Sequence, residues 1–427
     1  MKEPCWPTIH SLSIKFTKLG FERIGKLLKK LENPQDKMPS IFHVAGTNGK
    51  GSVLSFIKAI LEAQNYKAHR YISPHLIDFN ERIEITGKQI SDNYLNELVQ
   101  ECKIIDDKYK IDVSFFEGIT VMAFLAFARN KADATLLEVG MGGRLDATNV
   151  IKKPLITIIT SISLDHMHCL GNNIKTIAEE KAAIIKSGCP VIISKQKKAA
   201  SDIINRIAKE KNSPVYEYEK HWFIHKTKYG FIFEGFDKKL QLPFPSLAGD
   251  HQIINCGCAI AALLAQNKLK ISEQGLVSGI THTEWPGRLQ NLNNTRLNIF
   301  DKNSEVWLDS AHNEDGAKKL AAWLNNQNKI NLKKTVLVLG MLKRKQGKEL
   351  FLKNLNNTFD LLITTNISGE EQSANEMEKI AISLGIKNCL NLPSFQEAQE
   401  YIKQNFKNVR IVFCGSVYFA GEILQKV

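Results

Sequence analysis

Along the first 290 residues, short apolar runs alternate with stretches whose apolar residues recur at helical spacing. The runs 40–45, 134–139 and 155–159 each end at a polar or glycine-rich turn. Such runs are typical of strands that are buried on both faces. Residues 51–64 have apolar residues three and four apart, which predicts an amphipathic helix. Strands that alternate with helices predict a parallel sheet with helices on both faces.

The pattern changes twice further along the chain. Between residues 215 and 244 the apolar positions fall in short alternating segments, which predict a small antiparallel insertion sheet with strands at 216–218, 222–225 and 231–236. A polar stretch, 291–295, is expected to be a linker. The strand–helix alternation then returns, with strands predicted at 306–309, 335–339, 361–365 and 410–414. The pattern therefore predicts two α/β domains, at 1–292 and 298–427.

Composition excludes several classes of protein. The chain has 427 residues, enough for two or three domains, and 43% of them are hydrophobic. We find no run of 18 apolar residues that could cross a membrane, and the N-terminus lacks the apolar core of a secretory signal. The eight cysteines are scattered, so they do not form a disulfide framework. We expect a cytoplasmic protein that has no membrane partner.

The formal net charge of +13 comes from 57 Lys and Arg against 44 Asp and Glu. A nucleic-acid binder gathers such charge on one face and interleaves it with aromatic residues. Here the basic residues are spread thinly, and the longest clusters are 29–30 and 343–345. A positive field also attracts polyanionic substrates to an enzyme. We therefore expect no nucleic-acid partner, although a basic ATP-dependent nucleic-acid-binding protein remains an alternative.

The strongest local motif is residues 45–52, Ala-Gly-Thr-Asn-Gly-Lys-Gly-Ser, between a predicted strand and a predicted helix. Glycines there let backbone N–H groups surround phosphate oxygens, and the start of the helix favours an anion. Lys50 would reach the phosphates and Ser52 a Mg²⁺ ion. The generic P-loop spacing is not met, because it needs glycine at Val44 and Gly51 precedes the serine. A plain glycine turn is the alternative.

Three further features lie after predicted strands. Glu138 ends one strand and is followed by a glycine-rich turn, where a metal ligand could lie beside a nucleotide. The alternative is a surface loop in which Glu138 is an exposed strand end. His166 and His168 follow another strand, although a histidine in a loop is more often structural. Lys181 lies at the apolar edge of a predicted helix, where a lysine normally extends its charged end into solvent; partial burial would instead lower its pKa and free its amine for chemistry. Cys256-Gly-Cys258 has no second cysteine pair, so zinc is not expected, and no Gly-x-Ser-x-Gly elbow is present.

Taken in order, these motifs resemble the folylpolyglutamate synthase/dihydrofolate synthase family, a branch of the Mur-type ATP-dependent amide ligases. The resemblance extends over nearly the whole chain. It rests on the ordered motifs at 20–23, 43–52, 73–76, 80–83, 115–117, 138–149, 165–166, 180–186, 251–255, 285–290, 309–313, 339–342 and 414–416.

The resemblance implies the fold and the site. The fold is an N-terminal P-loop-type parallel-sheet ATPase domain with a small antiparallel insertion, followed by a smaller Rossmann-like α/β domain. The implied ATP-binding residues are Gly46, Thr47, Asn48, Gly49, Lys50, Gly51, Ser52, Asn255, Arg288, Asp309 and His312. The implied Mg²⁺ ligands are Ser52, Ser73, Glu138 and His166, and Lys181 matches the lysine that is carbamylated in the family. The implied pteroate or folate contacts are Gly20, Phe21, Glu22, Arg23, Phe115, Phe116, Glu117, Leu145, Asp146 and Ala147.

The implied activity is an ATP-dependent addition of L-glutamate to dihydropteroate, to the γ-carboxylate of tetrahydrofolates, or to both, through an acyl phosphate. Such a reaction needs Mg²⁺ and cations more than a protein nucleophile, which agrees with the missing Ser and Cys signatures. A monomer is expected. The alternative is a Mur-type ligase that adds an amino acid to a UDP-linked cell-wall precursor.

Three features depart from the family pattern. Ala183 stands where the family usually has glycine, and the stretch from Arg288 to Asp309 is long. The basic segment 343–345 receives no role from the resemblance.

Overall fold

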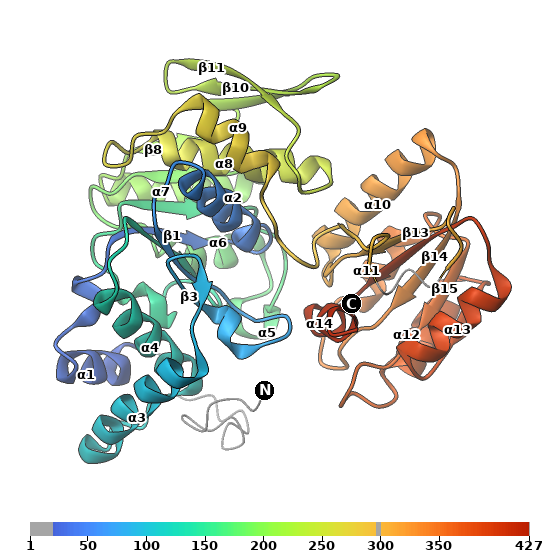
Figure 1. Cartoon of the computed structure of the whole chain (residues 1–427), viewed down its shortest axis with the longest axis horizontal. Coiled ribbons are helices and arrows are strands. Elements are labelled where there is room, and N and C mark those ends of the chain that lie inside the picture. The colour runs from blue at the N-terminus through green and yellow to red at the C-terminus, as the bar shows by residue number, and fades with distance from the viewer. Residues whose placement is uncertain (1–19, 296–299, 427) are drawn as a thin grey trace. The chain divides into compact units, whose positions relative to one another are not determined.

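The computed structural model describes residues 20–295 and 300–426, which divide into two compact units (Figure 1). Of the described residues, the first unit contains 20–163, 167–246 and 252–284. The second unit contains 164–166, 247–251, 285–295 and 300–426. Each unit groups segments by their packing and includes segments from separate parts of the chain. The units therefore do not test the domain limits predicted at 292 and 298, which stay a prediction.

The first unit is built on an eight-stranded sheet with the order β4-β3-β2-β5-β1-β6-β7-β8. Its strands are β1 (Ser40–Ala45), β2 (Ala68–Tyr71), β3 (Ile83–Ile85), β4 (Lys88–Gln89), β5 (Ala134–Glu138), β6 (Ile156–Ile159), β7 (Val191–Ile193) and β8 (Val215–Glu217). The six strands from β2 to β8 in this order are parallel, and β3 and β4 extend the sheet as an antiparallel hairpin. This confirms the predicted parallel sheet.

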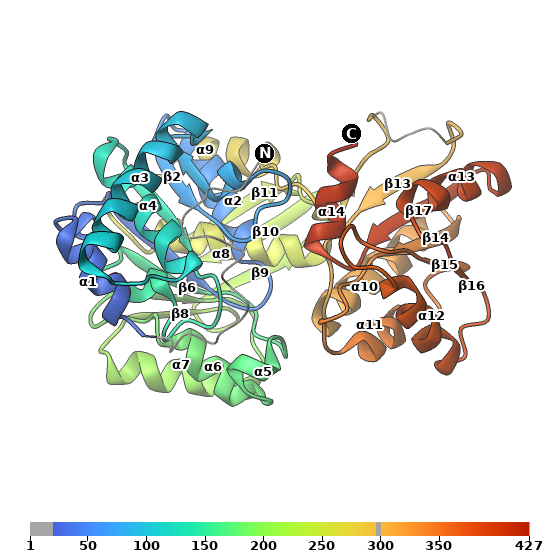
Figure 2. The same cartoon turned by 90° about the horizontal axis from the view of Figure 1, so that it is seen from below.

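Helices cover both faces of this sheet. Before residue 285 they are α1 (Glu22–Lys30), α2 (Lys50–Glu62), α3 (Asp92–Tyr109), α4 (Phe115–Arg129), α5 (Met167–Leu170), α6 (Ile174–Ala182), α7 (Lys198–Glu210), α8 (Asp250–Leu264) and α9 (Glu273–Thr281). The connection from β1 to β2 passes through α2 and runs in one direction across the sheet. The connections that pass through α4, α6 and α7 run in the opposite direction. Right-handed crossovers therefore place α2 on the opposite face from those three helices. Figure 2 shows α6 and α7 side by side along one side of the unit.

The predicted insertion sheet is partly wrong. The three-stranded antiparallel sheet consists of β9 (Trp222–Lys226), β10 (Gly230–Gly235) and β11 (Lys238–Pro243). The segment predicted at 216–218 belongs instead to β8, which pairs in parallel with β7 at the edge of the large sheet. The sequence alternates there, as Tyr-Glu-Tyr at 216–218, but the burial does not, because Glu217 is the buried residue of β8 and Val215 and Tyr216 are half-buried.

The second unit has a six-stranded sheet with the order β12-β13-β17-β14-β15-β16. Its strands are β12 (Gln290–Asn291), β13 (Glu305–Leu308), β14 (Lys334–Leu339), β15 (Leu361–Thr364), β16 (Cys389–Asn391) and β17 (Val409–Cys414), and its helices are α10 (Glu314–Ile330), α11 (Lys348–Leu355), α12 (Ser373–Ser383), α13 (Phe395–Asn405) and α14 (Val417–Leu424). All strand pairs except β12–β13 are parallel. The expected linker at 291–295 therefore begins inside β12.

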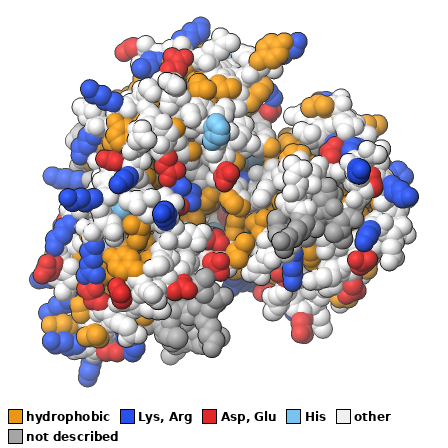
Figure 3. Space-filling view, in the orientation of Figure 1, with side chains coloured by type: hydrophobic (Ala, Val, Ile, Leu, Met, Phe, Trp, Pro, Cys, Tyr) orange, Lys and Arg blue, Asp and Glu red, His pale blue; other side chains and the backbone are white. Residues whose placement is uncertain are grey.

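Two surface properties bear on the excluded classes. Within residues 20–295 and 300–426, no helix combines the length and apolar character that crossing a bilayer requires. On the face drawn in Figure 3, the Lys and Arg side chains are scattered among Asp and Glu rather than gathered in one patch.

His43 is a buried polar side chain in the central strand β1. Its Nε2 lies 2.9 Å from the Thr148 hydroxyl, and its Nδ1 has no hydrogen-bond partner among the described residues. Burial, with a smaller contribution from the Lys186 charge, lowers the pKa of His43 to about 3. Because the unfolded chain binds a proton near pH 6.5, folding keeps this imidazole neutral at a cost that grows on acidification.

This property predicts how stability depends on pH. Above about pH 6.5 the neutral His43 costs the folded state nothing. As the pH falls from about 6.5 towards 3, keeping His43 neutral lowers the free energy of unfolding, by on the order of 3 kcal/mol at pH 4. We expect His43→Gln, which keeps a polar partner for Thr148, to flatten the decrease of the unfolding midpoint between pH 7 and pH 4. Thermal unfolding of both proteins at matched pH measures this difference. An equal pH dependence in the two proteins would contradict the assignment.

Candidate functional site

The glycine-rich motif forms a tight loop between β1 and α2. Gly46 follows β1 with a φ of +154°, and a Cβ there would lie 1.8 Å from the Thr160 hydroxyl. Gly49 precedes the first residue of α2 with a φ of +91°, and a Cβ there would lie 2.7 Å from Asn255 Oδ1. Both positions therefore require glycine. The structure confirms the strand–loop–helix arrangement. The first N–H groups of α2 have no acceptor within the helix, so they can donate to an anion at its N-terminus.

A second segment, which the sequence did not single out, holds this loop. The N–H groups of Thr47 and Asn48 donate to the Ser161 carbonyl, at 2.9 and 3.3 Å. The Thr47 hydroxyl donates to the Ser163 carbonyl and accepts from the Ser163 N–H, each at 3.1 Å. The Ser163 hydroxyl is buried beside these contacts and has no hydrogen-bond partner among the described residues. Residues 160–163 follow β6, which pairs with β1 in the sheet. The sequence does not show which strands pair, so it could not place this segment beside the loop.

Two lysines and a carboxylate converge on the loop. Lys50 Nζ lies 3.3 Å from the Gly46 carbonyl and 3.7 Å from Glu138 Oε1. Lys181, on α6, is 5% exposed, and its Nζ donates to the same Gly46 carbonyl at 2.9 Å. Glu138 is the last residue of β5 and is 5% exposed. Glu138 is therefore not an exposed strand end, and Lys181 is not a solvated lysine; both of these alternatives from the sequence are wrong.

The turn after β5 is packed too closely for side chains. A Cβ at Gly140 would lie 2.3 Å from the Phe116 ring, and a Cβ at Gly143 would lie 2.5 Å from the Glu180 carbonyl. The turn then reaches Asp146, whose carboxylate accepts from the Met141 N–H at 3.0 Å and from the Thr148 N–H and hydroxyl at 3.0 and 2.5 Å. Burial raises the pKa of Asp146, and these hydrogen bonds oppose the shift.

The segments expected to bind pteroate lie together in the first unit. Arg23 Nε donates to Glu117 Oε2 at 3.1 Å, which links α1 to the start of α4. Glu117 also accepts from the Ser114 N–H at 2.7 Å as part of the capping box of α4. The Phe116 ring packs against Gly140, in the turn that leads to residues 145–147. Gly20 is half-buried, and Phe21 and Glu22 are exposed at the start of α1.

Three of the four expected metal ligands belong to the first unit. Ser52 is in the first turn of α2, and Ser73 comes two residues after β2. Because β2 and β1 both flank β5, the ends of these strands meet at the edge where Glu138 lies. His166 is exposed and is grouped with the second unit, so the four residues are not brought together within one unit. In the described part of the chain, no three His, Cys, Asp or Glu side chains form a metal cluster.

The expected ATP-binding residues are likewise divided between the units. Asn255 is buried in α8 beside Gly49, and its amide donates to Gln252 Oε1 at 2.9 Å. In the second unit, Asp309 accepts from the Leu289 and Ala311 N–H groups at 2.9 and 2.8 Å. Burial raises the pKa of Asp309, and the nearby Arg288 charge opposes that shift. His312 Nδ1 lies 2.9 Å from the Ser310 carbonyl.

The basic segment 343–345 has a structural partner that the sequence did not predict. Lys345 Nζ lies 2.6 Å from Asp165 Oδ1, and the Asn313 amide donates to Asp165 Oδ2 at 2.9 Å. Burial alone would raise the pKa of Asp165. The His312 hydrogen bond and the Lys345 charge outweigh burial and hold that pKa well below its usual range. Lys345 therefore neutralises a largely buried carboxylate within the second unit.

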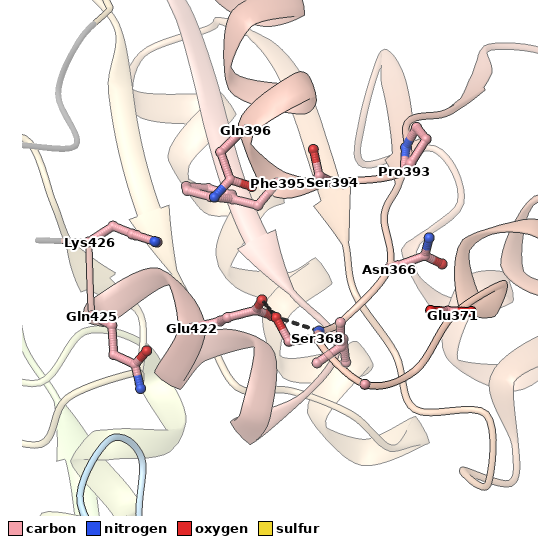
Figure 4. A pocket seen from close by; sticks show the side chains of 12 residues that line it. Asn366, Ser368, Glu371, Pro393, Ser394, Phe395, Gln396, Glu422, Gln425 and Lys426 are labelled. Carbon is pink, nitrogen blue, oxygen red and sulfur yellow. Dashed lines mark hydrogen bonds between the residues drawn. The ribbon is translucent and has the colours of Figure 1, made fainter. Parts of the chain in front are cut away.

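The second unit also contains a cavity of about 380 Å³ at the ends of β15 and β16 (Figure 4). Its lining includes Asn366, Ser368, Gln396, Glu422 and Lys426. The Glu422 carboxylate accepts from the Ser368 hydroxyl and, at 3.3 Å, from the Ser368 N–H. The Glu422 carboxylate is thus already bound to a residue of the cavity wall, and we assign the cavity no part in the site.

Comparisons with known proteins agree with this arrangement. Residues 44–263 match the family model of the Mur ligase middle domain, and residues 291–426 match that of the dihydrofolate synthetase C-terminal domain. The dihydrofolate synthase/folylpolyglutamate synthase of Bacillus subtilis is 38% identical over 322 residues, which cover 72% of this chain and 73% of the relative.

Two solved structures share the fold. E. coli FolC in complex with DHPP and ADP has a TM-score of 0.87 and 28% identity, covering 97% of this chain and 95% of that chain. A bifunctional folylpolyglutamate synthase/dihydrofolate synthase with Mn, AMPPNP and L-glutamate bound has a TM-score of 0.83 and 27% identity, covering 96% and 94%. The match to the Bacillus subtilis enzyme and the two family models show that the chain belongs to the dihydrofolate synthase/folylpolyglutamate synthase family of Mur-type ligases.

Proposed function

We propose that this protein is a bifunctional, Mg²⁺-dependent ligase that uses ATP to join L-glutamate to dihydropteroate and to the γ-carboxylate of tetrahydrofolates. The observation that carries the proposal is the convergence of Lys50, Lys181 and Glu138 on the phosphate-type loop at the end of β1. The match of residues 291–426 to the dihydrofolate synthetase C-terminal domain favours folate over a cell-wall precursor.

The chemistry explains why the site contains cations and no nucleophile. A carboxylate is a poor acyl donor, so an acceptor oxygen first attacks the γ-phosphorus of ATP and gives an acyl phosphate and ADP. The glutamate amine then attacks the acyl carbon, loses a proton and releases phosphate. The N–H groups at the start of α2 and the Lys50 ammonium hold the transferring phosphoryl group and stabilise its charge. The Ser163 hydroxyl, which is buried next to Thr47, is a further donor for a phosphate oxygen.

The proposed metal ligands suit a hard cation. Ser52, Ser73 and Glu138 supply oxygen atoms and His166 an imidazole, and Mg²⁺ prefers oxygen ligands. The buried Glu138 carboxylate, with Lys50 3.7 Å away, gives the negative charge that such a site requires. When bound, Mg²⁺ neutralises phosphate charge during phosphoryl transfer.

The remaining predicted residues bind the substrates in this proposal. Residues 20–23, 115–117 and 145–147 hold the pterin-bearing acceptor, which is supported by the contacts of Arg23 with Glu117 and of Phe116 with the glycine turn. Asn255 fixes the loop at Gly49. Arg288, Asp309 and His312 of the second unit are further contacts of ATP in this proposal. There Asp309 also orders the backbone through Leu289 and Ala311.

The most direct experiment measures phosphate release with ATP and L-glutamate, using dihydropteroate and tetrahydrofolate as separate acceptors. We expect release with each acceptor, because the pteroate segments at 115–117 and 145–147 contact the common part of both. Omission of L-glutamate or of the acceptor is the control. Activity with tetrahydrofolate and none with dihydropteroate would restrict the protein to polyglutamylation, and no activity with either would overturn the proposal.

Lys181 should carry a carbamate in the active enzyme. Its amine is buried against the Gly46 carbonyl, and a carbamate keeps one N–H for that contact while it adds oxygen atoms that a cation prefers. We expect Lys181→Ala to lose activity by about a hundredfold, and short carboxylic acids to restore part of it. A ¹³C NMR carbamate signal after incubation with ¹³C-bicarbonate tests the modification independently of activity.

Lys175→Ala is the matched control, because Lys175 is exposed on the same helix. It should keep both the activity and the NMR signal. Full activity of Lys181→Ala in bicarbonate-free buffer would show that the carbamate has no role.

A further inference from the structure

Two of the motifs in the chain, 73–76 and 80–83, have no role in the proposed reaction beyond Ser73. They surround Arg82, the last residue of a short 3-10 turn, Phe79–Arg82, that follows β2. Arg82 is buried, with 9% of the residue exposed.

The surroundings fix the orientation of Arg82. Its Nε donates to His75 Nδ1 at 2.8 Å. Its guanidinium carbon lies 5.6 Å from the centre of the Phe79 ring and 5.9 Å from the centre of the Phe115 ring. The two rings meet edge to face, 6.1 Å apart. Arg82 is thus held against an aromatic wall, one side of which is Phe115 of the proposed pteroate segment.

His75 is a neutral partner in this arrangement. Since its Nδ1 accepts from Arg82, the ring carries its proton on Nε2. The pair therefore keeps a single positive charge at neutral pH, and that charge belongs to a guanidinium whose plane His75 orients.

Arg82 also lies beside the end of β2. The N–H of Ile72, the residue before the proposed metal ligand Ser73, donates to the Arg82 carbonyl at 3.1 Å. The ring of Tyr71, the last residue of β2, is 6.2 Å from the Phe116 ring. The end of β2 thus lies near Arg82 and near the proposed pteroate segment 115–117.

We infer that Arg82, oriented by His75, binds the carboxylate of the pterin-bearing acceptor and holds it for phosphoryl transfer; this rests on the proposed function. A guanidinium presents a planar fork that matches a carboxylate, and apolar walls strengthen the pairing because they exclude water. Phe79 and Phe115 supply such walls and suit the aromatic ring that bears the carboxylate in dihydropteroate. In the competing hypothesis, Arg82 only balances the buried charges of Glu138 and Asp146.

The test compares two ligands that differ only at the carboxyl group, dihydropteroate and its uncharged carboxamide. Their affinities are measured for the wild-type chain, for Arg82→Gln and for Arg82→Lys, each saturated with AMPPNP and Mg²⁺. We expect the wild type to prefer the carboxylate by about tenfold to a hundredfold, and Arg82→Gln to lose this preference. Arg82→Lys keeps the charge but not the planar fork, so it should lose most of the preference for the carboxylate. His75→Asn should lose part of that preference.

Nucleotide affinity reports whether each variant has folded. Arg129→Gln is the matched control, because Arg129 is an arginine of the same unit whose partner is the exposed Glu101, and it should keep the wild-type preference. If Arg82→Gln binds AMPPNP poorly, Arg82→Lys decides the question. A wild-type preference retained in either folded variant would overturn the inference. Failure of the proposed function is distinguishable, since the wild type itself would then release no phosphate with dihydropteroate.

Discussion

The carbonyl of Gly46 is the point on which the first unit's site depends. Lys181 donates to it at 2.9 Å and Lys50 lies 3.3 Å from it, so two lysine side chains meet at one peptide oxygen. The peptide can occupy this place because residue 46 has no side chain, and a Cβ would overlap the Thr160 hydroxyl. The positions of α2, α6 and the end of β6 are thereby fixed relative to one another.

The parallel sheet explains why chemically different residues gather there. The ends of β2, β5, β1 and β6 lie at one edge, and they are followed by Ser73, by the glycine turn, by the phosphate-type loop and by Ser163. Ligands of open α/β sheets bind at this edge, close to the strand where the chain changes direction. Here that strand is β1, because the chain leaves it towards β2 on one side and later adds β6 on the other.

The sequence predicted the elements that carry a strong period or a glycine signature. The strands predicted from short apolar runs bounded by turn residues were located to within a residue or two. The buried strands β2 and β7 were not predicted. β8 was misassigned because its sequence, Tyr-Glu-Tyr at 216–218, alternates, although Glu217 is the buried residue of the strand. The two-residue strand β12 was missed because it is too short to show a period, and its polar residues indicate a linker.

Within the site, the sequence pointed to residues through local motifs and missed those that act through distant contacts. Lys50, Glu138 and Lys181 were found from their places after strands and on a helix. The contacts of Ser161 and Ser163 with the loop connect residues more than 110 positions apart, so only the sheet order reveals them. The role of Lys345 was also missed, because its partner Asp165 is 180 positions away in the sequence.

The central claim is that this site transfers the γ-phosphoryl group of ATP to an acceptor carboxylate. The most direct measurement follows oxygen during one turnover, with dihydropteroate labelled with ¹⁸O in both carboxylate oxygens, unlabelled ATP and L-glutamate. An acyl phosphate leaves its bridging oxygen on the phosphate, so mass spectrometry should find one ¹⁸O atom in each phosphate released. Release of unlabelled phosphate alongside formation of the amide would contradict the account.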